Sequence, residues 1–157
     1  MKKHLILDPP QAGEPAPIQA SGRTTARPST ALHALATDTA PPALGPYSQA
    51  IRAGGMIYCA GQAATDPATG ALVAGGIKEQ TRQVLRNLAA VLESGGSSLD
   101  RSVKITVYLS DWALFKEMNE AYAEFFTTSH PPARSTVQGA RWPAGHLVGM
   151  DVIAVDG

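Results

Sequence analysis

A single arginine follows a rigid segment near the C-terminal end of the chain, in SHPPARSTV (residues 129–137). Pro131 and Pro132 fix two backbone φ angles, so less conformational entropy is lost when the Arg134 side chain is placed. The planar guanidinium carries paired N–H donors that suit a carboxylate. Arg134 is therefore a candidate carboxylate clamp. The alternative is an arginine in an interface or in a surface ion pair.

A second candidate is an amide inside an apolar helical stripe. Phe115, Asn119, Tyr122 and Phe126 follow one another at i, i+4, i+7 and i+11, so they share one face of a helix. A buried amide without hydrogen-bond partners costs about 1–3 kcal/mol for each unsatisfied group. Asn119 therefore either bonds the nearby main chain or supports a functional site.

Other residue types offer less chemistry. The single cysteine, Cys59, falls inside a predicted strand, where a small core residue is expected. The four histidines show no metal-ligand spacing, and no phosphate-binding glycine loop occurs. We therefore expect neither a metal nor a cofactor.

Composition limits the classes of function. The 157 residues are 44% apolar and 17% charged, which is typical of one soluble globular domain. Thirteen basic and thirteen acidic side chains give no net charge to attract nucleic acid or a membrane surface. No apolar run approaches the roughly 20 residues of a membrane span. With one cysteine and no predicted secretory segment, a reducing, cytoplasmic location is expected.

The chain divides near residue 31. Residues 1–31 are rich in Pro, Ala, Ser and Thr without apolar periodicity, which predicts a flexible tail. Residues 32–157 then form the domain, with 9 basic and 11 acidic side chains.

Hydrophobic periodicity in this domain predicts alternating strands and helices. Helices are expected from residue 77 to the Gly95-Gly96 stop and from the capping residues Ser110 or Asp111 to about Phe126. Strands are expected at 31–37, 48–53, 56–62, 103–109, 134–140 and 147–155, with Val103, Ile105, Val107 and Leu109 on the covered face. This order predicts an α+β fold, a mixed sheet with two helices on one face. The other face needs cover, which self-association would provide.

Four motifs in this region resemble those of one known family. APPALGPYSQAI (40–51), GQAATDPATG (61–70), NEAYAEFF (119–126) and PPARSTV (131–137) occur in this order, ahead of a final VIAV strand. Together they resemble the RidA/YjgF family of reactive intermediate deaminases. The resemblance covers nearly all of residues 32–157.

The resemblance implies a chorismate-mutase-like fold and a homotrimer with a central β-barrel and three clefts between subunits. It implies cofactor-independent hydrolysis of enamines and imines such as 2-aminoacrylate, giving 2-oxo acids and ammonia. Arg134 would hold the substrate carboxylate, and Tyr47 and Asn119 would lie in or beside the cleft. Thr136 stands where many members have cysteine.

Two departures from the family pattern bear on activity. Ala60 replaces a frequent serine, and Gly149 stands where the deaminases carry a water-holding glutamate. Asp151, two residues further along the same strand face, could take over that role or serve a subunit interface. Three alternatives stay open: deamination of a larger enamine such as 2-aminomuconate, a non-catalytic carboxylate-binding or chaperone-like trimer, and a ribonuclease. The net charge of −2 on residues 32–157 argues against the ribonuclease.

Overall fold

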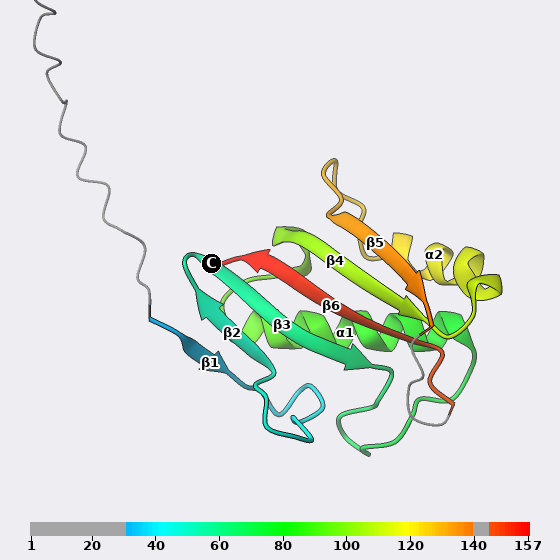
Figure 1. Ribbon diagram of the computed structural model, residues 1–157, viewed down its shortest axis with the longest axis horizontal. Coiled ribbons are helices and arrows are strands. Elements are labelled where there is room, and N and C mark those ends of the chain that lie inside the picture. The colour runs from blue at the N-terminus through cyan, green and yellow to red at the C-terminus, as the bar shows by residue number, and fades with distance from the viewer. Residues whose placement is uncertain (1–30, 140–144) are drawn as a thin grey trace, which may run out of the picture.

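The computed structural model describes residues 31–139 and 145–157 (Figure 1). The tail expected at residues 1–31 lies outside this part of the chain, apart from Ala31. The described residues form strands and helices in the order βββαβαββ, as expected. Their bounds are β1 (His33–Leu35), β2 (Ala50–Ala53), β3 (Met56–Ala63), α1 (Ile77–Ser94), β4 (Ser102–Leu109), α2 (Phe115–Ala123), β5 (Ala133–Gln138) and β6 (Val148–Val155).

The strands form one mixed sheet in the order β1-β2-β3-β6-β4-β5. Strands β4 and β5 are parallel and are joined by α2, whereas the other neighbouring pairs are antiparallel. The last strand, β6, lies between β3 and β4, so the connection from β3 to β4 through α1 passes over β6. Strand β5, which carries Arg134, is therefore an edge strand.

Both helices cover the same face of the sheet, which confirms the expected α+β arrangement (Figure 1). The apolar stripe of α1 packs on the central strands, because residues three and four apart share a helix face. The core between the layers includes Leu85, Leu88, Ile105, Val107, Met150 and Val152, all fully buried.

Within residues 31–139 and 145–157, no helix covers the sheet face away from α1 and α2 (Figure 1). Tyr58, Val137 and Val155 point to this open face and are 46%, 44% and 41% exposed. The hairpin between β2 and β3 turns through Gly54 and Gly55 at φ of 59° and 80°, values that glycine adopts without steric cost.

Among the described residues, no helix combines the length and apolar composition of a membrane span.

Two local expectations were wrong. Val103 was expected on the covered face, but a register shift between Ser102 and Lys104 turns it outward, and it is 46% exposed. The second helix was expected to run to about Phe126. It begins with a 3₁₀ turn, Trp112–Leu114, and its α-helical part ends at Ala123. Asp111 does cap this segment, since its carboxylate accepts a hydrogen bond from the Ala113 N–H at 2.8 Å.

Candidate functional site

Arg134 lies on the covered face at the edge of the sheet. It pairs with Ile105, a fully buried residue of the neighbouring strand β4, so its side chain points toward the helices. The guanidinium carbon lies 4.6 Å from the centre of the Tyr122 ring and 5.8 Å from that of Phe115. Both distances are those of cation–π contacts. The residue is half-buried, and its setting is aromatic.

Helix α2 supplies this aromatic setting. Phe115, Asn119 and Tyr122 share one helix face, as their spacing predicted, and Asn119 lies between the two rings along that face. Tyr122 is 6% exposed and packs against Phe126 in a tilted arrangement, with the ring centres 4.4 Å apart. Asn119 is half-buried, and its place on the helix face lies between the two residues whose rings contact Arg134.

Thr136 follows Arg134 on the same face of β5. It pairs with the buried Val107 and is itself half-buried. Gln138, two residues further, accepts a hydrogen bond from the Trp112 N–H at 3.1 Å and so joins the strand to the start of the helix segment. The structure therefore brings three of the expected site residues, Arg134, Asn119 and Thr136, to one edge of the sheet.

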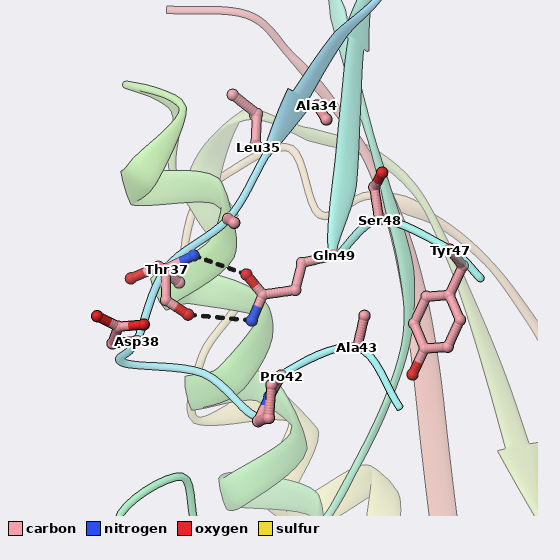
Figure 2. A pocket seen from close by; sticks show the side chains of 10 residues that line it. Ala34, Leu35, Thr37, Asp38, Pro42, Ala43, Tyr47, Ser48 and Gln49 are labelled. Atoms are coloured by element: carbon pink, nitrogen blue, oxygen red, sulfur yellow. Dashed lines mark hydrogen bonds between the residues drawn. The ribbon is translucent and has the colours of Figure 1, made fainter. Parts of the chain in front are cut away.

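Tyr47 lies elsewhere, in the loop between β1 and β2. It is 51% exposed, and its hydroxyl accepts a hydrogen bond from the Leu44 N–H at 3.2 Å. Its ring lines two cavities. The first, of about 310 Å³, lies between the loop and β1 (Figure 2). The second, of about 370 Å³, is bounded by Pro41, Pro42, Leu44, Tyr47, Gly61, Gln62, Ala63, Thr65, Gly70 and His146.

A buried amide, Gln49, holds the loop that carries Tyr47. Its side-chain oxygen accepts from the Thr37 N–H at 2.6 Å. Its amide nitrogen donates to the carbonyls of Thr37, Ala40 and Pro41 at 3.0, 3.3 and 2.8 Å. The pair of bonds to Thr37 is drawn in Figure 2. Gln49 is only 4% exposed, so these bonds are shielded from water and fix the shape of both cavities.

Two further amides on α1 hold the other walls of the larger cavity. Gln80 donates to the Gly145 carbonyl at 3.0 Å and accepts from the Leu147 N–H at 2.8 Å, which fixes the backbone on both sides of His146. Asn87 donates to the carbonyls of Ala63 and Thr65 at 3.1 and 2.9 Å. These three amides were not predicted from the sequence. A signal was present for two of them, because Gln80 and Asn87 occupy buried positions of a largely apolar helix stripe.

Asp151 lies on the open face of the sheet. It pairs with Thr106 on β4 and is half-buried. Its carboxylate accepts a hydrogen bond from the Tyr108 hydroxyl at 2.7 Å. That hydrogen bond, with burial and the negative charge of Asp151, raises the pKa of Tyr108. Gly149 is on the same face, opposite Tyr108 and Ala63. Within one chain, Asp151 therefore does not join Arg134.

Cys59 is a buried core residue, as expected. It is 7% exposed, and burial, followed by the negative charge of Asp151, raises the pKa of its thiol to about 12. The described residues contain no cluster of three or more His, Cys, Asp or Glu side chains that could hold a metal ion.

The family model for Endoribonuclease L-PSP matches residues 37–156. A RutC family protein of Pyrococcus horikoshii is 51% identical over 75% of this chain and 93% of its own length. The 2-iminobutanoate/2-iminopropanoate deaminase of Mus musculus is 42% identical over 78% of this chain and 90% of its own length. The crystal structure of E. coli TdcF with bound serine has a TM-score of 0.75 and 35% identity, and the match covers 80% of this chain and 99% of that one.

Proposed function

This chain belongs to the Endoribonuclease L-PSP family, the RidA/YjgF proteins, and we propose that it is a cofactor-independent deaminase of small 2-imino acids. Its substrates are imines and enamines of the 2-aminoacrylate and 2-iminopropanoate type, and its products are 2-oxo acids and ammonia. The relatedness to 2-iminobutanoate/2-iminopropanoate deaminases at 42% identity supports the reaction class.

The observation that carries the proposal is the state of Arg134. Its guanidinium rests on aromatic rings, and no carboxylate of the described residues forms an ion pair with it. Aromatic contact occupies a flat face of the group and leaves the in-plane N–H donors for a ligand. A 2-imino acid carries the carboxylate that these donors suit. The serine bound in the related TdcF structure carries one as well.

The remaining site residues require a second subunit. Arg134 is on β5, while the cavity beside Tyr47 is bounded by the end of β3, three strands away. Three strand spacings are about 14 Å, too far for one small substrate to contact both groups. We propose a homotrimer in which the open sheet faces pack together. The Arg134 group of one subunit then meets the Tyr47 loop of the next.

The chemistry needs a positioned carboxylate and an activated water. After the enamine tautomerises to the imine, water adds to the C=N carbon, and the resulting carbinolamine expels ammonia to leave the 2-oxo acid. Arg134 holds the carboxylate, while Asn119 and Thr136 line the substrate site at the same edge of the sheet. Asp151 is the candidate to orient the water, because Gly149 offers no carboxylate.

Gly149 favours one alternative substrate class. Gly149 carries no side chain at the position opposite Tyr108, and its backbone is buried within one chain. A longer enamine dicarboxylate, such as 2-aminomuconate, is the substrate that the absence of a glutamate here would suit. The non-catalytic carboxylate-binding trimer remains the alternative outside the enzymes.

A coupled assay tests the proposal. A serine or threonine dehydratase releases the enamine from its amino acid in the presence of this protein, and release of 2-oxo acid and loss of free enamine are followed. We expect faster release with the wild-type protein and no acceleration with Arg134→Ala. Unchanged release, with calorimetry showing that the protein binds pyruvate, would instead support a binding protein. 2-Aminomuconate serves as the competing substrate in the same assay.

A further inference from the structure

Two pairs of aromatic rings lie beneath Arg134, and together they are called the aromatic platform here. Tyr122 lies 4.6 Å from the guanidinium carbon and is backed by Phe126 at 4.4 Å. Phe115 lies 5.8 Å from the same carbon and is backed by Trp112 at 4.8 Å in a stacked arrangement. Each ring that contacts Arg134 is therefore itself held by a second ring.

The two supporting rings differ in how firmly they are held. Tyr122 is 6% exposed and belongs to the core cluster, whereas Phe115 is half-buried at its edge. The Tyr122 hydroxyl makes no hydrogen bond of standard geometry among the described residues. Burial raises the pKa of the Tyr122 phenol to about 12, and the charge of Arg134, together with a weak hydrogen-bond interaction between the two side chains, partly opposes that rise. Tyr122 is thus the more firmly held of the two rings that contact Arg134.

A fixed ring constrains what Arg134 can do. The arginine side chain has many rotamers, and β5 is the edge strand of the sheet that the described residues form. Contact with a buried ring restricts the guanidinium to orientations in which its flat face meets that ring. Its N–H donors then point along the platform, toward the place where a bidentate carboxylate would bind.

We propose that Tyr122 is a positioning residue, whose ring sets the plane of the Arg134 guanidinium for carboxylate binding. This inference rests on the proposed function. It assigns the ring, and not the hydroxyl, as the active part of Tyr122. It also predicts that the residue affects KM through Arg134 and does not take part in the water attack.

Two substitutions separate the ring from the hydroxyl. Tyr122→Phe keeps the ring, so we expect KM for the imino acid within about twofold of wild type. Tyr122→Leu removes the ring, and we expect KM to rise about tenfold with kcat changed less than about threefold. Phe125→Leu is the matched control, because it removes a partly buried ring from the same segment, and the cation–π contacts of Arg134 among the described residues are with Phe115 and Tyr122. It should lower the melting temperature without changing KM.

A spectroscopic measurement reads the positioning without turnover. In a proton–nitrogen NMR spectrum, the Nε–H signal of Arg134, assigned by its loss in Arg134→Lys, should be shifted upfield by the ring beneath it. The shift should persist in Tyr122→Phe and disappear in Tyr122→Leu, with the folded state checked by circular dichroism. An unchanged signal in Tyr122→Leu overturns the inference. Wild-type protein that shows the shift but neither binds pyruvate nor hydrolyses the imine overturns the proposed function instead.

Discussion

Arg134 and Asp151 leave the sheet on opposite faces. Arg134 pairs with Ile105, which in turn pairs with Val152, and all three point toward the helices. Asp151 precedes Val152 and therefore points to the open face, where its carboxylate accepts a hydrogen bond from the Tyr108 hydroxyl at 2.7 Å. A clamp and a water-orienting carboxylate at these positions can act on one substrate only if two subunits meet. The proposed mechanism therefore depends on the proposed trimer.

The first prediction concerns that assembly. Ile153 is half-buried on the open face opposite Tyr58, so an Ile153→Lys substitution should place a charge inside the subunit interface. We expect light scattering to give about three times the subunit mass for wild type and a smaller mass for the variant, with activity lost. Glu93→Lys, at an exposed position near the end of α1, is the control and should stay trimeric. A fully active wild-type monomer would contradict the two-subunit site.

The second prediction concerns the clamp. Arg134→Lys keeps the charge but loses the planar pair of donors, so KM should rise by about tenfold or more. Arg134→Ala should nearly abolish turnover. In both variants circular dichroism and oligomeric mass should stay unchanged, because Arg134 forms no ion pair with the described residues. Loss of the assembly in Arg134→Ala, rather than loss of binding, would mean that the arginine is an interface residue.

The third prediction addresses the carboxylate. If Asp151 orients the water, Asp151→Ala should lower kcat by about 10²-fold or more with little change in KM. If it does not, Asp151→Ala should be silent and Gly149→Glu should raise kcat. Steady-state kinetics on the same imino acid decide between these results. A kcat unaffected by either substitution would mean that no side chain at these two positions of β6 takes part in activating the water.

Much of the fold could be predicted from the sequence, because period-two and helical spacing show directly in the apolar residues. The order of elements, the two helices on one face and the stripe of Phe115, Asn119 and Tyr122 follow from such local patterns. The outward turn of Val103 could not be predicted, since it results from a register shift between two strands far apart in the chain.

The site was less accessible to sequence reasoning. The flanking prolines made Arg134 a candidate carboxylate clamp, which stays a prediction, but the aromatic platform beneath it depends on how α2 packs against β5. The role of Gln49 as a loop anchor depends on carbonyls eight to twelve residues away that only the folded loop brings together. Pairing of Asp151 with Tyr108 likewise follows from the antiparallel register of β4 and β6.

The fourth prediction concerns Tyr122 at alkaline pH. Burial raises the pKa of its phenol from 10.0 to about 12, and the charge of Arg134 only partly opposes this. Because the pKa is higher in the folded state, the unfolded chain loses its proton first as the pH rises. The contribution of the neutral Tyr122 phenol to the free energy of unfolding is therefore complete below pH 10 and is lost as the pH approaches about 12.

Absorbance of tyrosinate near 295 nm should therefore show a late step in the wild-type protein that is missing in Tyr122→Phe. The free energy of unfolding, measured with urea between pH 9 and 11, should fall less steeply in the variant, since it has no phenol to ionise at this position. Tyr108, whose pKa is also raised, provides the internal check: Asp151→Ala removes its acceptor and should shift its titration down without moving the late step. A late step that survives in Tyr122→Phe would come from another tyrosine. It would contradict the raised pKa of Tyr122 and mean that this ring is more accessible to water than its packing under Arg134 implies.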